Sequence, residues 1–152
     1  MPTKIREIVN SDDGTVSHIV IELDSVPGDS SSRIDIVNPL ETLQCALIEM
    51  AKDQTFEPHV HPKRLTSGSA GNTQEAWVII SGQVEATLYN VHGEVIENVL
   101  LKSGDACITL RGGHNYTSKV DGTLVYEFKT GPYLGPDIDK KMVSELNVRT
   151  GD

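Results

Sequence analysis

Short apolar segments separated by turn residues recur along the chain, and this alternation constrains the fold more than any other feature. Turn sequences that contain glycine stand at 11–14, 81–82, 91–93, 102–105, 111–113 and 121–122. Glycine, aspartate and asparagine tolerate the positive φ that tight hairpins require. Around these turns we expect strands at 16–23, 33–37, 43–51, 56–61, 75–81, 83–90, 95–101, 106–110, 114–120 and 123–129. Many short strands without a long stretch of helical periodicity predict an all-β sandwich or barrel.

The length of the chain, 152 residues, suits one domain with a substantial hydrophobic core. Within it we expect an N-terminal β-arm at 1–42 that packs on a barrel at 43–130, followed by a C-terminal extension at 131–152. In this extension, Asp139 could cap a short helix that runs to about Leu146.

One long segment, residues 62–74, interrupts the strand pattern. Its serine, glycine, threonine and asparagine content predicts a loop. Long loops in compact domains are usually functional or mobile. We therefore expect this segment to influence ligand binding more than stability.

The charge and hydropathy of the chain argue against several classes of partner. A net charge of −9 disfavours binding to nucleic acid, which needs a basic surface, and adhesion to an anionic membrane. No apolar run approaches the roughly 20 residues of a membrane span, and the N-terminus lacks the apolar core of a secretory signal. We expect a cytoplasmic protein in which Cys45 and Cys107 are buried, reduced thiols.

Three histidines and one glutamate carry the chemical signal. His59 and His61 are two residues apart in FEPHVHP, so on an extended strand they project to the same side. Glu75 opens the segment EAWVIIS, and His114 follows a glycine turn. Imidazole is the commonest metal ligand, and a carboxylate completes a mixed set suited to iron, nickel, manganese or zinc. The sequence predicts one mononuclear divalent-metal site that these four side chains form inside a barrel.

These residues resemble the first sequence motif of the cupin superfamily, and the whole resemblance covers roughly residues 43–130. In that motif, a His-x-His pair is followed by a short gap and then by Glu, six residues and Gly. His59 and His61 form the pair, and Glu75 with Gly82 reproduces the second half, although the gap is longer here.

The second cupin motif begins with Gly-Asp and ends in a histidine near a glycine. Gly104, Asp105 and His114 match it, with an interval one residue shorter than usual. Two positions depart from the motifs, because Asp53 stands where the first has glycine and Leu110 where the second has proline.

The resemblance implies a double-stranded β-helix, that is, a jelly-roll barrel, with the metal at its wider mouth. The expected fold is therefore an all-β cupin barrel with a short C-terminal helix or tail. The resemblance also implies a homodimer, because cupins often pack their sheets together or exchange N-terminal strands. Residues 16–37 are the candidate interface.

Further candidates surround the predicted metal. The cationic ones are Lys63, Arg64 and Arg111, which lie near the expected barrel mouth in sequence. They could hold a phosphate or carboxylate of a substrate, or they could be solvated loop charges. Trp77 shares a strand face with Glu75 and could line the cavity together with Tyr116, or both aromatic side chains could pack in the core.

Three functions remain open from the sequence. The first is a metal-dependent enzyme on a small molecule, an isomerase, lyase or oxygenase, whose positively charged centre favours anionic or carbonyl substrates. The second is a metal-independent sugar-nucleotide isomerase or epimerase of polysaccharide biosynthesis, with His59 or His61 as base and Tyr116 as acid. The third is a cupin that binds a small ligand without catalysis.

Overall fold

The computed structural model describes residues 3–23, 32–61, 63–66 and 69–146. Strands β1 to β5 span Thr3–Val9, Val16–Leu23, Ser32–Asp35, Leu43–Met50 and His59–Val60. Strands β6 to β10 span Lys63–Thr66, Ser69–Asn72, Glu75–Ser81, Gln83–Tyr89 and Val95–Lys102. Strands β11 to β13 span Ala106–Thr109, Gly113–Ser118 and Thr123–Thr130. The C-terminal elements are α1 (Pro136–Asp139), β14 (Lys141–Met142) and α2 (Val143–Leu146).

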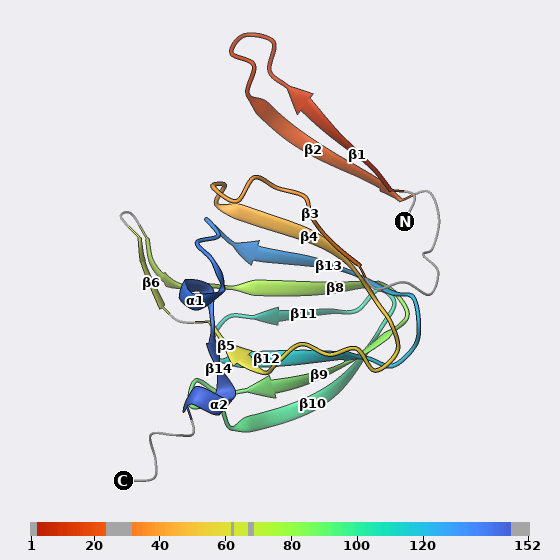
Figure 1. The fold of residues 1–152 in the computed structure, drawn as a ribbon, viewed down its shortest axis with the longest axis vertical. Coiled ribbons are helices and arrows are strands. Elements are labelled where there is room, and N and C mark those ends of the chain that lie inside the picture. Colours follow the sequence, from red (N-terminus) through yellow and green to blue (C-terminus); the bar gives the residue numbers. More distant parts are fainter. Residues whose placement is uncertain (1–2, 24–31, 62, 67–68, 147–152) are drawn as a thin grey trace.

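Two five-stranded antiparallel sheets make up the body of the molecule (Figure 1). The first has the order β10-β9-β12-β5-β14 and the second the order β11-β8-β13-β4-β3. Most neighbouring strands are distant in sequence, because the chain crosses repeatedly from one sheet to the other. The predicted all-β barrel is confirmed.

Alternation along the strands places the hydrophobic core between the two sheets. In β8, Glu75, Trp77 and Ile79 are buried while the residues between them are partly exposed, as expected for a period of two. The turn into β9 needs glycine at Gly82, where φ is 87° and a Cβ atom would collide with Thr123. The tight turn fixes which side chains of both strands face inward.

The segment 62–74 contains two short strands instead of the expected loop. β6 pairs antiparallel with β7, and Lys63 lies opposite Asn72. The prediction was wrong because the segment has no alternating apolar side chains. Its pairing depends on backbone groups, which almost every residue type supplies.

In its described part, residues 131–146, the C-terminal extension forms two helices of one turn each with β14 between them. The prediction that Asp139 caps a helix to Leu146 was wrong, since Asp139 ends α1 and the chain is extended at Lys141 and Met142. The helix is interrupted because these two residues pair with β5 at the edge of the first sheet. No helix among the described residues is long and apolar enough to cross a membrane.

β1 and β2 form a two-stranded sheet of their own. Figure 1 shows this hairpin beyond β3, the edge strand of the second sheet. The sequence did not predict β1, because charged residues interrupt its apolar positions. The packing of an N-terminal arm at 1–42 on the barrel stays a prediction. Cys45 is buried as expected, whereas Cys107 on the edge strand β11 is only half-buried, and both are free thiols.

Candidate metal centre

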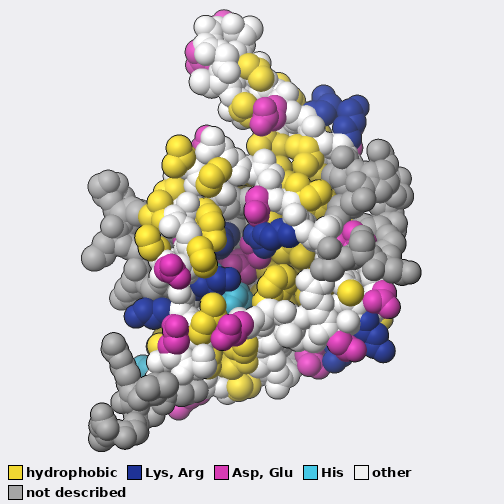
Figure 2. All heavy atoms as spheres, viewed as in Figure 1, with side chains coloured by type: hydrophobic (Ala, Val, Ile, Leu, Met, Phe, Trp, Pro, Cys, Tyr) yellow, Lys and Arg dark blue, Asp and Glu magenta, His cyan; other side chains and the backbone are white. Residues whose placement is uncertain are grey.

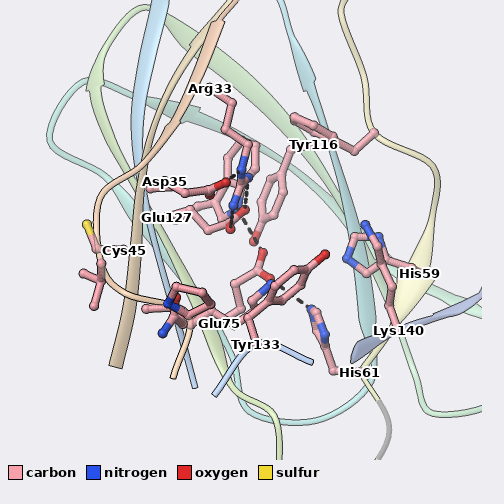
Figure 3. A pocket seen from close by; sticks show the side chains of 17 residues that line it. Arg33, Asp35, Cys45, His59, His61, Glu75, Tyr116, Glu127, Tyr133 and Lys140 are labelled. Atoms are coloured by element: carbon pink, nitrogen blue, oxygen red, sulfur yellow. Dashed lines mark hydrogen bonds and ion pairs between the residues drawn. The ribbon is translucent and has the colours of Figure 1, made fainter. Parts of the chain in front are cut away.

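The four predicted ligands come from strands of both sheets. His59 begins β5 and lies opposite His114 on β12, His61 follows β5, and Glu75 begins β8 in the other sheet. Each residue offers a ligand atom within 4.8 Å of the others, and all four side chains are buried. Figure 3 shows His59, His61 and Glu75 pointing into the same pocket. The structure therefore brings together the set that spacing and motif resemblance predicted.

The distances inside this cluster match the size of a metal ion. The centroids of the three imidazole rings are 5.0 to 5.3 Å apart. The Glu75 carboxylate places Oε2 3.0 Å from Nε2 of His61 and Oε1 3.0 Å from Nε2 of His114. Ligands about 2.1 Å from one ion lie roughly 3 Å from each other when the angle between them is close to 90°. The donor set therefore fits a single divalent ion.

Backbone carbonyl groups orient two of the imidazole rings. Nδ1 of His59 donates to the carbonyl oxygen of Glu57 at 2.8 Å. Nδ1 of His61 donates to the carbonyl oxygen of Asp139 at 3.0 Å. A carbonyl only accepts, so Nδ1 carries a proton in both rings, and in the neutral imidazole Nε2 is then the nitrogen with the free lone pair. Such outer hydrogen bonds fix the tautomer and the orientation of metal-binding histidines.

His114 and Glu75 are held by side chains. Nδ1 of His114 is 2.7 Å from Oγ1 of Thr109, at the end of β11. Nε1 of Trp77 donates to Oε1 of Glu75 at 2.9 Å and also reaches Oε2 of Glu127 at 3.2 Å. The indole therefore links the candidate ligand to a second buried carboxylate.

Gly113 permits the close approach of β12 to β5. It lies opposite Val60, and a Cβ atom at this position would collide with the carbonyl oxygen of His59. Only glycine lets the two strands meet with His59 and His114 side by side. The glycine turn before His114 in the sequence thus has a structural purpose at the site.

The protonation states favour metal binding. Burial, together with the nearby His114 and His61, lowers the pKa of His59 to about 4, so this imidazole is neutral at pH 7. Burial opposes ionisation of Glu75, yet the adjacent His114 and His61 hold its pKa well below the ordinary value. A neutral imidazole and an ionised carboxylate are the forms that bind metals.

Comparison with known proteins identifies the architecture. No protein-family model matches the sequence, and no curated protein matches it. A double-stranded β-helix protein from Klebsiella pneumoniae is 19% identical, with a TM-score of 0.53, over 76% of this chain and 87% of its own. KdgF from Halomonas sp. is 17% identical, with a TM-score of 0.51, over 70% of this chain and 84% of its own. A cupin superfamily protein from Desulfitobacterium hafniense is 8% identical, with a TM-score of 0.50, over 70% of this chain and 83% of its own.

The chain has the cupin fold. The predicted double-stranded β-helix with a short C-terminal helix is confirmed. At identities below 20%, however, these likenesses establish the cupin fold alone. The chemistry of this chain therefore has to be inferred from its own side chains.

A cavity of about 490 Å³ opens over the histidine cluster at the mouth of the cupin barrel. Trp77 and Tyr116 line it, and their rings stack with centroids 4.0 Å apart. Both aromatic side chains are almost fully buried, so they belong to the core and to the cavity wall at once. Figure 2 shows the mouth as a hollow in which a histidine is visible between basic and acidic side chains.

Among the described side chains, the cations that line this cavity were not singled out by the sequence. Arg111 is exposed and borders a separate hollow of about 330 Å³. The side chains of Lys63 and Arg64 lie outside the described part of the chain, so their role stays a prediction. The structure instead places Arg33, Lys129 and Lys140 at the cavity.

Arg33 and Glu127 form the polar wall opposite the histidines, as Figure 3 shows. Arg33 binds Glu127 with an N–O distance of 2.8 Å and also pairs with Asp35 at 2.9 Å. Sequence reasoning missed these residues because Arg33 reaches the site only through the pairing of β3 with β4. The available signal was the presence of charged residues at inward positions of β13, Glu127 and Lys129.

Proposed function

We propose that this cupin binds one divalent metal ion through His59, His61, Glu75 and His114 and uses it to act on a small molecule. The supporting observation is that the four potential metal ligands converge in a buried site. Nε2 of His61 and Nε2 of His114 are buried, and each faces a Glu75 oxygen at 3.0 Å. When these imidazoles are neutral with the lone pair on Nε2, the carboxylate repels them unless a cation lies between them. One divalent ion satisfies all four groups.

The donor set suits iron, nickel, manganese or zinc. Four protein ligands leave one or two positions of a five- or six-coordinate ion open, and a metal bound there would polarise a carbonyl or carboxylate oxygen of the substrate. The protein contributes the rest of the site. Trp77 and Tyr116 keep water from one side, and Trp77 fixes the orientation of Glu75. We propose isomerase, lyase or oxygenase chemistry on an anionic or carbonyl substrate.

Metal analysis of point variants tests the proposal. Freshly purified protein should contain about one divalent ion per chain by elemental mass spectrometry. His61→Ala and His114→Ala should each lose most of this metal but keep the circular dichroism spectrum of the wild type, because the barrel is built from other contacts. His92→Ala is the matched control, since this exposed histidine lies in the turn between β9 and β10. Full metal occupancy in both ligand variants would contradict the assignment.

One observation disfavours the metal-independent alternative. Burial raises the pKa of the Tyr116 phenol above its ordinary value. A general acid works best with a pKa near the working pH, so Tyr116 is poorly suited to donate a proton. Turnover of sugar nucleotides by chelator-treated protein would nevertheless support that alternative. Ligand binding by the metal-loaded protein without turnover of sugar nucleotides or keto acids would support a cupin without catalysis.

The proposal includes two further properties that rest on the sequence. We propose a cytoplasmic location, which suits the free thiols of Cys45 and Cys107. We also propose a homodimer whose interface involves residues 16–37. The β1–β2 hairpin supports this proposal, because Ile5, Ile8 and Val16 are 38 to 46% exposed.

A further inference from the structure

Asp139 touches the metal centre with both its backbone and its side chain. It ends α1 and is 1% exposed. Its carbonyl oxygen accepts the Nδ1 proton of His61 at 3.0 Å, and its carboxylate oxygen Oδ2 lies 3.2 Å from Nζ of Lys129. A residue outside the two cupin motifs thus joins the centre at two points.

Lys129 lies next to another candidate ligand. It is directly opposite Glu75 in the pairing of β13 with β8. Residues in such pairs project from the same face of the sheet and stand side by side. The side chain of Lys129 is only 13% exposed, and it lines the cavity. The Asp139 carboxylate therefore holds a buried cation beside Glu75 while its carbonyl holds the ring of His61.

The residues that follow Asp139 bind the strand that carries the histidine pair. Met142 in β14 lies opposite His59 in β5. The amide of Val143 donates to the carbonyl oxygen of Pro58 at 2.9 Å, and the side chain of Val143 is buried. The segment from α1 to α2 is thereby attached at the edge of the first sheet, directly beside two of the ligands.

We infer that Asp139 is a positioning residue of the metal centre and that it couples metal binding to the docking of residues 136–146. The inference rests on the proposed function, because it requires the four ligands to hold a cation. An ion that binds Nε2 fixes the ring of His61, and a fixed ring strengthens the hydrogen bond from Nδ1 to Asp139. Coupling between two binding events is reciprocal, so docking of the segment strengthens metal binding and metal binding strengthens docking.

Removal of the Asp139 charge should weaken metal binding, although Asp139 is not itself a ligand. Without the Asp139 carboxylate, the largely buried Lys129 keeps the attraction of Glu127 and Glu75 but loses its ion pair with Asp139, which makes its burial more costly. The segment then shifts, and the carbonyl that orients His61 shifts with it. Loss of such an outer partner typically weakens metal binding by 10- to 100-fold.

Asp139→Asn tests this inference against Asp137→Asn, which changes an exposed aspartate on the same helix. Full-length protein is stripped with chelator and titrated with zinc in competition with a chromophoric chelator. We expect zinc affinity to fall about tenfold or more in Asp139→Asn and to stay within about twofold in Asp137→Asn. With cobalt as probe, the visible absorption bands of Asp139→Asn should also shift, because one ligand ring has turned.

Hydrogen exchange measures the reciprocal effect. Zinc should slow exchange of the Val143 amide in the wild type and in Asp137→Asn, and should do so much less in Asp139→Asn. Lys129→Met provides a second variant if Asp139→Asn does not fold, and it should show the same loss of affinity. Wild-type zinc affinity and an unchanged cobalt spectrum in the folded variants would overturn the inference while leaving the proposed function intact. Failure of the wild type to bind any metal would instead overturn the proposed function, and the inference with it.

Discussion

His59 shows how burial prepares a single residue for its task. The imidazole is 8% exposed, and its Nδ1 proton is already committed to a backbone carbonyl. A histidine in water carries a proton on about a quarter of its molecules at pH 7, given an ordinary pKa near 6.5. A proton competes with a metal for the imidazole lone pair. The lowered pKa of His59 removes this competition, so the lone pair is available to a metal throughout the neutral range.

The same shift predicts the pH dependence of stability in metal-free protein. The folded pKa of His59, about 4, lies below the unfolded value of 6.5, so the unfolded chain binds more protons between these two values. The stabilisation from His59 is therefore complete above pH 6.5 and is lost as the pH falls toward 4, by at most about 3 kcal/mol. Urea denaturation of chelator-treated wild type and His59→Gln from pH 4 to 7.5 measures the effect. The variant should have the flatter profile, and two parallel profiles would refute the role of His59.

At the scale of strands, the contact between β5 and β12 sets the geometry of the site. Gly113→Ala places a methyl group against the backbone of His59. We expect the strands to separate, with a loss of about 2 kcal/mol in unfolding free energy and a weaker affinity for zinc. Gly71→Ala is the control, because a Cβ atom there has no neighbour within 4 Å. Equal stability and zinc affinity in both variants would show that β5 tolerates the displacement.

The strands of the barrel were predictable where two local signals coincide. β8 and β9 combine alternating apolar residues with a glycine turn at Gly82, and the structure reproduces their predicted ranges almost to the residue. β6 and β7 lack the alternating apolar residues and were not predicted. Local signals therefore suffice for strands that form the core, because burial itself imposes the alternation.

The candidate site was predictable only in part, for a related reason. His59 and His61 stand out because their spacing alone places them on one side of a strand. Arg33 and Glu127 do not, since their contact depends on strands 94 residues apart in the chain. Asp139 was noticed only as a helix cap, because its carbonyl oxygen, which every residue possesses, has no signature in the sequence. Local sequence patterns do not identify residues that act through tertiary contacts or through their backbone groups.

At the scale of the whole molecule, the N-terminal hairpin stands out because its two strands form a sheet separate from the two sheets of the barrel. An isolated two-stranded sheet is at best marginally stable in water. β1 and β2 nevertheless pair along their full lengths, with Ile5 opposite Ile21. Ile5 is exposed, and Ile21 on the same face is partly exposed. A second copy of the chain would cover this apolar surface, which is the physical basis for the proposed homodimer.

Ile5→Glu tests the dimer directly. A charge in a buried interface costs several kcal/mol when it has no partner, so the variant should sediment as a monomer of 16.5 kDa while the wild type sediments at twice that mass. His92→Gln changes an exposed residue in the turn between β9 and β10, outside the proposed interface, and should leave the dimer intact. Zinc affinity should be equal in all three proteins, because the four ligands belong to one chain. A wild type that sediments as a monomer at micromolar concentration would show that the hairpin needs no second copy.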